Sequence, residues 1–534
     1  MNLTLELATA ATVVASWLFS YLIYSQSKRG FPFPTVGLRN ELSAHVRTTL
    51  RNLREAEGLK NAIHQGYSRF TKHSRLFVLP CYLNGDMVIV PREHASAIAN
   101  APDSELDPYP VADEYMQKDY TMTIRPNEAI IIETIRKHLT GKSLESMLPT
   151  IEEEIEASFD DTWGTNYDDW TEIHPWSATI QIASRTLNRV LSGPTICRNP
   201  LYIASLISYM RDVLLDAVII RAFPRIPRPV AAAFVTRRLR RNLKTFTKLM
   251  LPHVEERVRQ MRRKQEDPDL DWEAPNDFIT WHVEASYRAK SAYERDPYII
   301  CERLNVMNLV AGHTSPLALS NFLIDFFSLD SSSNTALEER LAALTEEVER
   351  VYAEECPNGQ WTQTALNKLV RVDSALKESF RLHPLSLKSV ERKVMGDTGF
   401  LIADSGTVPK GSVVGLPIWE IHQDPDNYGP NAASYDPFRY SRAIETGAAS
   451  AAPKAYAATT PSSDFLHFGL GRHACPGRFI AVQMLKMDIA YLLRNYEVQP
   501  IAKKPPILFQ NLALLPQKNF VLKVRRKQRD GCLK

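Results

Sequence analysis

The chain has 534 residues and a formal net charge of +3, and hydrophobic residues make up 44% of it. A charge this close to zero argues against the strongly basic surface of a nucleic-acid-binding protein. The hydrophobic fraction is ordinary for a globular enzyme, and the length allows a large buried core. The six cysteines are scattered without a C-x-x-C pair, which argues against a disulfide framework or a zinc site and favours a reducing compartment.

The N-terminal region contains an uncharged, largely apolar stretch at residues 7–24. As a helix rising about 1.5 Å per residue, it would extend roughly 27 Å, which is just enough to cross a bilayer core. Lys28 and Arg29 follow it, so the downstream chain should remain in the cytosol. A cleaved signal peptide is the alternative, but the stretch lacks a basic leading region and a clean small-residue cleavage site. We therefore expect a membrane anchor with its flank over residues 1–30 and a folded domain over 31–534.

Short strand patterns and longer helical patterns fill much of the remaining chain. Residues 76–79 and 87–90 are apolar runs typical of short strands, and the Asn84-Gly85 pair between them is typical of a hairpin turn. Residues 204–266 contain two helical patterns that are separated by the proline-rich stretch 223–229. We therefore expect a small sheet near the N-terminus of the domain and helices along most of the central region.

A long, mostly apolar segment at residues 298–327 is interrupted by a polar turn around Thr314. Pro316 donates no hydrogen bond to the carbonyl four residues earlier, that of Gly312, and clashes with it. The helix should therefore open beside Thr314, whose hydroxyl can both donate and accept a hydrogen bond. His313, next to it, is a residue type that can pass protons near neutral pH. The alternative is a plain core helix with one polar turn.

A single cysteine lies between glycines at residues 468–478, and Pro476 follows it directly. Because proline is favoured at the first position of a helix, Cys475 should end a tight loop and a helix should follow. The positive end of that helix and its free N–H groups would favour thiolate over thiol. Such a thiolate suits an axial bond to haem iron, and Gly471 and Gly477 allow the backbone to lie close to a flat macrocycle. The alternative is a buried structural cysteine.

The Phe-x-x-Gly-x-x-x-Cys-x-Gly pattern at 468–477 resembles the haem-binding loop of the cytochrome P450 family. The family often has arginine two residues before the cysteine, where this chain has histidine. The Gly-Arg-His-Ala-Cys-Pro-Gly-Arg-Phe form is similar to that of many filamentous-fungal members. The resemblance implies that this loop supplies the iron ligand Cys475 and further haem contacts, with the histidine binding a propionate: Phe468, Gly471, Arg472 and His473.

Other segments resemble the same family in the same order along the chain. Glu378 and Arg381 match its Glu-x-x-Arg motif, and Arg439 resembles the third partner of a structural triad behind the haem; a surface ion pair is the alternative. Arg392 matches the arginine that binds a propionate. His138 ends a predicted helix that resembles the one lending a cation to a propionate, although adjacent cations at 136–138 are also typical of a solvated face.

The polar turn near Thr314 resembles the oxygen-binding groove of the family, Ala/Gly-Gly-x-Asp/Glu-Thr. Thr314 matches the threonine, whereas His313 stands at the position of the acid and Val310 replaces the first small residue. The resemblance implies that Thr314 steers protons during catalysis. His313 departs from the motif, and it is a second candidate for proton delivery because histidine can carry protons near neutral pH.

Membership of this family would imply one large, mainly helical domain with a small β portion, in place of the three or four domains that length alone suggests. It would also imply haem b, O2 and a hydrophobic substrate. The chain has no glycine-rich flavin or dinucleotide motif, so electrons from NADPH should come through a separate NADPH–cytochrome P450 reductase. The implied location is the endoplasmic reticulum membrane, with one membrane pass, a cytosolic catalytic domain and no nucleic-acid partner.

The substrate is expected from resemblance alone. Leu-Ser-Gly-Pro-Thr-Ile-Cys-Arg-Asn at 191–199 is similar to fungal P450s of terpenoid metabolism, which favours a diterpenoid or meroterpenoid. An indole alkaloid or polyketide tailoring enzyme is the alternative within the class, and a haem protein that binds a ligand without turnover is the alternative outside it. The basic run at 237–241 has three possible interpretations: a helix face exposed to solvent, a nucleic-acid-binding site, or a surface that contacts anionic lipid, as the corresponding region does in anchored P450s.

Overall fold

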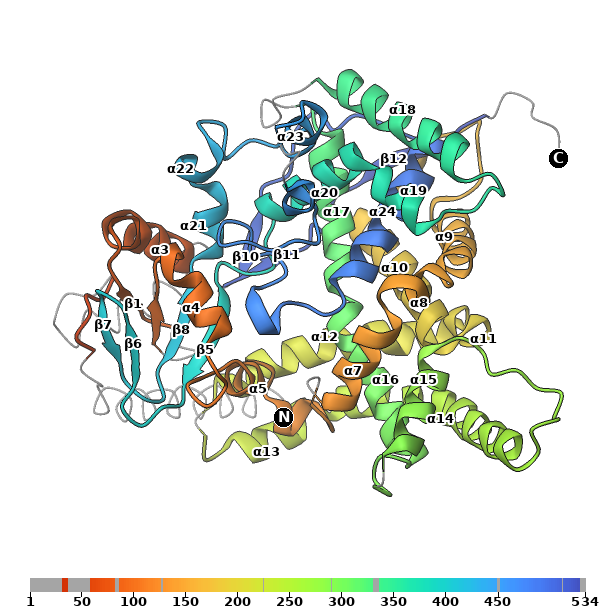
Figure 1. Ribbon diagram of the computed structural model, residues 1–534, viewed down its shortest axis with the longest axis horizontal. Helices are drawn as coiled ribbons and strands as arrows, with labels where there is room; N and C mark the ends of the chain where they lie inside the picture. The colour runs from red at the N-terminus through yellow and green to blue at the C-terminus, as the bar shows by residue number, and fades with distance from the viewer. Residues whose placement is uncertain are drawn as a thin grey trace, which may run out of the picture.

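Helices dominate the fold and the strands are short, as expected from the family resemblance (Figure 1). In Figure 1 the main sheet lies at one side of the molecule beside α3 and α4, and the long helices fill the other side. The predicted anchor at 7–24 and the Asn84-Gly85 turn lie outside the described residues, and no helix among the described ones is long and apolar enough to cross a membrane. The computed structural model describes residues 31–36, 58–81, 86–125, 128–223, 225–289, 291–329, 336–448, 452–510 and 512–528.

The helices begin and end where capping residues and prolines occur. Asn199, for example, precedes the proline that opens α12, and its side-chain oxygen accepts hydrogen bonds from the N–H groups of Leu201 and Tyr202 at 3.0 and 3.1 Å. The α-helices are α3 (Gly58–Arg69), α4 (Ala95–Asn100), α5 (Tyr109–Met116), α6 (Lys118–Thr121), α7 (Ala129–His138), α8 (Gly141–Glu145), α9 (Leu148–Trp163), α10 (Pro175–Ser192), α11 (Pro194–Cys197), α12 (Pro200–Arg221), α13 (Arg228–Val235), α14 (Arg237–Glu266), α15 (Phe278–Arg288), α16 (Pro297–Ala311), α17 (Thr314–Phe327), α18 (Leu337–Glu355), α19 (Gln363–Lys368), α20 (Val370–Leu382), α21 (Ile418–Gln423), α22 (Pro425–Tyr428), α23 (Ser441–Glu445) and α24 (Arg478–Asn495).

The strands form one larger sheet and smaller ones. The larger sheet has the order β1-β2-β8-β5-β3, in which β2 and β8 are parallel and the other pairs antiparallel. The two strands predicted near the N-terminus are β1 and β2, and they pair with Phe77 opposite Ile89. The strands are β1 (Phe77–Leu79), β2 (Met87–Ile89), β3 (Leu106–Asp107), β4 (Thr171–Ile173), β5 (Ser389–Val394), β6 (Phe400–Ile402), β7 (Gly406–Val408), β8 (Val413–Leu416), β9 (Tyr496–Val498), β10 (Leu508–Gln510), β11 (Ala513–Leu515) and β12 (Leu522–Arg526).

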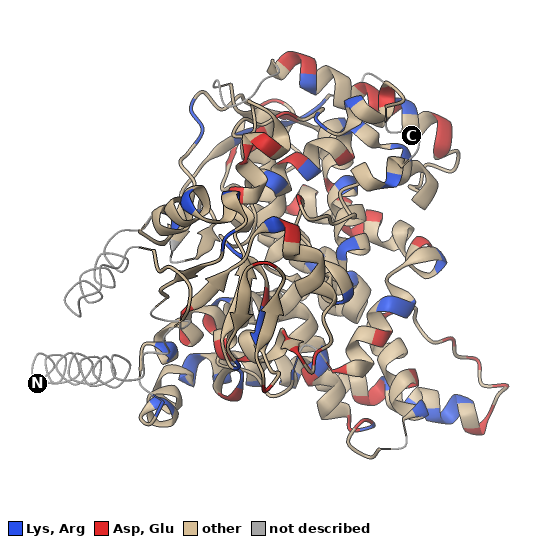
Figure 2. Cartoon of the chain, turned by 60° about the vertical axis from the view of Figure 1, so that its left-hand side comes forward, with Lys and Arg blue, Asp and Glu red and all other residues tan. Residues whose placement is uncertain are grey.

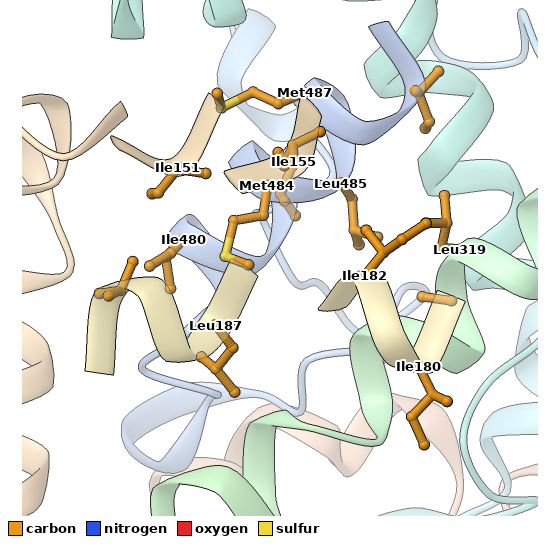
Figure 3. Close-up of a cluster of buried hydrophobic side chains, with 14 of the residues drawn as sticks. Ile151, Ile155, Ile180, Ile182, Leu187, Leu319, Ile480, Met484, Leu485 and Met487 are labelled. Carbon is orange, nitrogen blue, oxygen red and sulfur yellow. The ribbon is translucent and has the colours of Figure 1, made fainter. Parts of the chain in front are cut away.

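The helical core is built around α24, the helix that follows Cys475. Figure 3 shows its apolar side chains surrounded by side chains from α9, α10 and α17. Each such side chain contributes about 1.5–3 kcal/mol when fully buried. This packing holds α24 in place and therefore positions the loop before it. The residues labelled there are Ile151, Ile155, Ile180, Ile182, Leu187, Leu319, Ile480, Met484, Leu485 and Met487.

A buried carboxylate bound by two arginines lies behind that loop. Arg381 donates from Nε and Nη2 to the two carboxylate oxygens of Glu378 at 2.8 and 2.7 Å, and both side chains are fully buried. The Nε of Arg439 is 3.0 Å from each of the same oxygens. The predicted structural triad is thus present, and the alternative of a surface ion pair is wrong. Removing one partner of such a buried group is strongly destabilising, because a charge is left uncompensated.

His422 of α21 connects this triad to the cysteine loop. Its Nδ1 donates to the carbonyl of Arg381 at 3.0 Å, and its Nε2 accepts from the N–H of Leu466 at 2.9 Å. Since a carbonyl only accepts and an N–H only donates, the ring must be neutral with its proton on Nδ1. Burial accordingly lowers the pKa of His422 well below its ordinary value. His422 of α21 therefore links the residue just before the cysteine loop, Leu466, to α20, which carries Glu378 and Arg381.

Asp488 is a buried acid in the middle of α24. Its side chain is 3% exposed, and its Oδ1 has no hydrogen-bond partner among the described residues. Burial raises the pKa of Asp488 to about 8 from the ordinary 3.8. Because the folded state binds this proton more tightly than the unfolded state, the fold loses stability as the pH rises from 3.8 towards about 8.

Replacing Asp488 with asparagine should therefore stabilise the protein in a pH-dependent way. We expect Asp488→Asn to raise the free energy of unfolding by roughly 1–3 kcal/mol at pH 7.5, because asparagine is neutral in both states, whereas the aspartate is ionised in the unfolded chain and must bind a proton on folding. At pH 4 both side chains are neutral, so the difference should nearly vanish. Thermal melting at the two pH values checks this, with the exposed Asp271→Asn as control. An equal effect at both pH values would show that the carboxyl does not titrate as described.

Candidate active site

The cysteine loop turns tightly and leads directly into α24. The Cys475 N–H donates to the carbonyl of Phe468 at 2.8 Å, and Gly469 and Gly471 adopt positive φ angles of 72° and 68°. A Cβ at Gly471 would lie 2.7 Å from the backbone oxygen of Ala99, so glycine is required for α4 to pack on the loop. The predicted order of loop, cysteine and helix is confirmed, with the helix beginning at Arg478.

The sulfur of Cys475 is accessible although the surrounding protein desolvates it. The backbone N–H groups of Gly477 and Arg478 hydrogen-bond to it, as expected at the start of a helix. Burial is the larger influence, however, and it raises the pKa of Cys475 above its ordinary value. The two N–H groups lower this pKa, so the effect expected of the helix start is present, but in the free thiol it is smaller than the effect of burial. A coordinated metal ion would deprotonate it.

Aromatic contacts hold the first residues of the loop against α20. The ring of His467 stacks on Phe380 with centroids 4.2 Å apart, and Phe468 meets the same ring edge-on at 5.5 Å. His467 also lies with Nδ1 3.2 Å from the backbone oxygen of Phe380. Burial lowers the pKa of His467 to about 4, so the ring is neutral. Sequence analysis missed these two residues because His467 precedes the cysteine-loop motif and Phe380 occupies a variable position of Glu-x-x-Arg.

The polar residues predicted to contact a propionate come together at the other edge of the loop. Arg472 Nη2 and His473 Nε2 lie 2.5 and 2.8 Å from the same oxygen of Asp103. Arg392 of β5 is 5% exposed and interacts electrostatically with Asp103 and Arg472. The hydroxyl of Tyr109 is 3.4 Å from His473 Nδ1. Asp103 and Tyr109 were missed from the sequence, since they lie more than 360 residues from the loop and belong to no motif.

His138 lies apart from this cluster. Its ring stacks on Trp281 of α15, with centroids 4.6 Å apart and planes 7° from parallel. Burial lowers the pKa of His138 to about 4, so it is neutral at physiological pH. A neutral ring stacked on α15 is not a cation for a carboxylate. The propionate contact expected of His138 stays a prediction, and these two observations argue against it.

The long apolar segment is broken beside Thr314, as Pro316 predicts. Helix α16 ends at Ala311 and α17 begins at Thr314. The Thr314 hydroxyl donates to the carbonyl of Ala311 at 3.4 Å, a long contact that leaves it free to rotate. His313 Nδ1 lies 2.7 Å from the carbonyl of Leu309, so its proton is on Nδ1 and Nε2 is an acceptor.

The environment of this break differs from that of a plain core helix. Val310 is 37% exposed, although most neighbouring residues of the two helices are buried. Burial lowers the pKa of His313, so its ring is neutral at physiological pH. Helix α17 packs against α20 and α24, the two helices that flank the cysteine loop. The catalytic roles of Thr314 and His313 stay predictions.

Comparison with known proteins decides the family. A family model described as Cytochrome P450 matches residues 334–524. The cytochrome P450 monooxygenase htyF of Aspergillus rugulosus is 33% identical over 523 residues, which cover 94% of this chain and 74% of that protein. This chain belongs to the cytochrome P450 family. The P450 monooxygenase gloP of Glarea lozoyensis is 29% identical, covering 92% of this chain and 90% of its own. The P450 monooxygenase okaG of Penicillium ochrochloron is 28% identical, and the match covers 99% of this chain and 100% of that protein.

Membership implies a haem with cysteine-thiolate ligation, and the residues of this P450 fit that group. Among the cysteines that the structure describes, Cys475 is exposed and the others, Cys81, Cys197, Cys301 and Cys356, are buried. An iron atom can therefore reach Cys475 and not the rest. Within the described part of the chain, Arg392 makes one hydrogen bond, from Nη1 to the Glu391 carbonyl at 2.9 Å, and its remaining donors suit a carboxylate. The relatives are named monooxygenases, so this chain is an oxidoreductase of that kind.

Proposed function

We propose that this P450 inserts one oxygen atom from O2 into a hydrophobic small molecule, with haem b held by Cys475. The observation that carries the proposal is an accessible sulfur at the start of α24 with two backbone N–H donors. Haem bound there would supply the oxygen activation. Electrons would come from NADPH through a separate NADPH–cytochrome P450 reductase, as in the family.

Other residues around the sulfur would tune its charge and orient the cofactor. The N–H groups of Gly477 and Arg478 would spread negative charge away from the sulfur and limit how strongly it donates to the metal. Phe468 lies at the start of the loop, where its ring is held by Phe380. Arg392 would bind a propionate, and Arg472 adds a second positive charge nearby. These contacts orient the cofactor without taking part in the reaction.

Thr314 is the residue we propose for proton delivery. Its hydroxyl makes one long contact and can turn to accept a proton from one side and donate to the other. His313 presents Nε2 as an acceptor, because its Nδ1 proton faces the carbonyl of Leu309. A relay through His313 would therefore pick up and release a proton at Nε2 while the ring stays oriented by that carbonyl.

We propose a fungal terpenoid or meroterpenoid as the substrate class. The stretch at 191–199 that favours it forms the corner between α10 and α12, where Arg198 Nε pairs with Glu154 at 2.7 Å and Asn199 caps α12. These residues therefore shape the fold, and the substrate class rests on the resemblance. An indole alkaloid or polyketide tailoring enzyme is the alternative. Comparing metabolites from a strain expressing this chain and one lacking it distinguishes them.

We propose that residues 7–24 anchor this P450 in the endoplasmic reticulum membrane, with the catalytic domain in the cytosol. The corner around α13 supports lipid contact, because Ile226, Val230 and Phe234 are 87%, 64% and 58% exposed. Arg238 of the basic run is bound to Asp212 at 2.6 Å, so that residue helps to join α14 to α12. Acidic and basic residues alternate along the elements coloured in Figure 2, which does not favour nucleic acid.

Membrane association should therefore have two parts. We expect the full chain in the membrane pellet and a chain lacking residues 1–28 to bind phosphatidylserine-containing vesicles more weakly. Adding Val230→Glu and Phe234→Glu to the shortened chain should abolish vesicle binding, since charges replace the apolar contact. Tyr167→Glu, at another exposed aromatic residue, is the control. Secretion of the full chain after cleavage near residue 25, or unchanged vesicle binding by the double variant, would contradict this proposal.

Thr314→Ala should separate electron consumption from product formation. The change removes the hydroxyl and leaves a small void, so haem content should survive. NADPH consumption should continue while product falls by ~10²–10⁴-fold, the usual worth of acid–base help. Free hydrogen peroxide should rise, because protons reach the wrong oxygen.

His313→Ala is the companion variant. If His313 relays protons, this change should also uncouple the enzyme. Because burial lowers the pKa of His313 below the ordinary 6.5, the effect should be constant across neutral pH and change only in more acidic solution. If His313 only fills the core, coupling should stay normal and the melting temperature should drop. Normal coupling in both variants would contradict the proposed proton path. A haem carrier without turnover would instead show itself in the unchanged protein, as haem binding with neither product nor substrate-dependent NADPH consumption.

A further inference from the structure

Asp103 is an acid that the family motif does not assign, and it lies in the turn between α4 and β3. Its Oδ1 accepts hydrogen bonds from Arg472 Nη2 at 2.5 Å and from His473 Nε2 at 2.8 Å. Burial alone would raise the pKa of Asp103, but His473 and Arg472 outweigh it and hold that pKa below the ordinary value. Asp103 is therefore ionised at physiological pH and accepts both bonds.

This contact determines how His473 is oriented. A carboxylate only accepts, so the proton between Asp103 and His473 belongs to Nε2. In the neutral ring Nδ1 is then an acceptor, and the hydroxyl of Tyr109 lies 3.4 Å from it. The Tyr109 ring meets the His473 ring edge-on, with centroids 5.4 Å apart. Both nitrogens of His473 therefore have partners within the chain.

Arg392 is the buried arginine of this cluster, at 5% exposed, whereas Arg472 is 44% exposed. Arg392 Nη1 donates a hydrogen bond to the carbonyl of Glu391, and the Arg392 guanidinium interacts electrostatically with Asp103 and Tyr109. Sequence analysis expected His473 to replace the usual arginine as the propionate contact. The geometry gives His473 a further task, because its ring lies between Asp103 and Tyr109 and links them.

We propose that Asp103 is a positioning residue, which fixes His473 and through it Tyr109 and leaves Arg392 to bind the haem propionate. The proposal rests on the proposed haem binding at Cys475. It explains how the chain tolerates histidine where the family often has arginine: the carboxylate and the hydroxyl hold the ring as a structural link. The Asp103 carboxylate also places a negative charge beside Arg392 and Arg472.

The same contacts connect the cysteine loop to α5. Tyr109 is the first residue of α5, a helix in which no residue is fully buried. The far end of α5 is joined to the α12–α13 corner, where Glu114 pairs with Arg228 at 2.7 Å and Arg221 lies 4.4 Å from the Tyr115 ring centroid. Asp103 thus secures the end of α5 that lies against the loop.

The test uses the full-length, haem-loaded protein and five variants, of which the fifth, Arg392→Gln, is described below. Asp103→Asn removes the charge, Tyr109→Phe removes the hydroxyl, and the double variant combines them. Asp113→Asn is the matched control, because Asp113 lies on α5 and pairs with Arg125 at 2.8 Å, away from the loop. Two quantities are measured: the rate of haem loss to excess apomyoglobin and the midpoint potential of the haem iron.

Asp103→Asn should speed haem loss about tenfold, as expected for a hydrogen bond to a charged group, and Tyr109→Phe about two- to threefold. The double variant should lose haem no faster than Asp103→Asn, because both changes break the same chain of contacts. Loss of the carboxylate should shift the midpoint potential in the positive direction, since a negative charge near the haem edge disfavours reduction. Tyr109→Phe and Asp113→Asn should leave the potential unchanged.

Two results would overturn the proposal. If the effects of Asp103→Asn and Tyr109→Phe multiply in the double variant, the two residues act independently. If Asp103→Asn resembles Asp113→Asn in both measurements, Asp103 does not position the haem contacts. Arg392→Gln tests the claim that Arg392 binds the propionate, and this variant should lose haem faster than Asp103→Asn. Failure of the unchanged protein to bind haem would instead contradict the proposed function.

Discussion

The hydrogen-bonded carboxylate of Glu378 is the interaction on which the rest of this fold depends. Arg381 and Arg439 neutralise it inside the protein, and Arg381 also donates to the backbone oxygen of Ala432 at 2.6 Å. His422 carries the constraint to Leu466 at the start of the cysteine loop. A buried ion group of this kind adds little net stability compared with apolar packing, but it admits few geometries. We infer that this ion group serves to fix the position of the cysteine loop, because a haem ligand must be held in one place.

The active site combines this rigid support with a more adjustable face. The Cys475 loop is supported by α24 and α20, whose contacts are mainly apolar and aromatic. The opposite parts are held more loosely: Thr314 makes one long contact, and α5 is attached mainly through polar contacts at its ends. This division suits a P450, in which the metal ligand must stay fixed while proton donors and the covering segments adapt to O2 and substrate.

Much of this architecture could be predicted from local sequence. The cysteine loop, the opening at Pro316 and the Glu378 triad follow from short motifs, since a proline or a charged pair has few structural solutions. Asp103, Tyr109, His422 and His467 could not be predicted, because each acts through a partner distant in the chain. His138 shows the opposite case: its helix matches a family pattern, but its ring stacks on Trp281. The pKa of Cys475 also depends on burial, which a motif does not reveal.

The central claim is that Cys475 is the ligand of the haem iron, and the spectrum of the reduced protein with carbon monoxide tests it most directly. The unchanged protein should show the red-shifted Soret band of a thiolate-ligated haem, and so should Cys356→Ser, in which a buried cysteine outside the loop is replaced. Cys475→Ser should lose that band, because a hydroxyl does not replace the thiolate. Retention of the band in Cys475→Ser would show that another residue ligates the iron and would contradict this account.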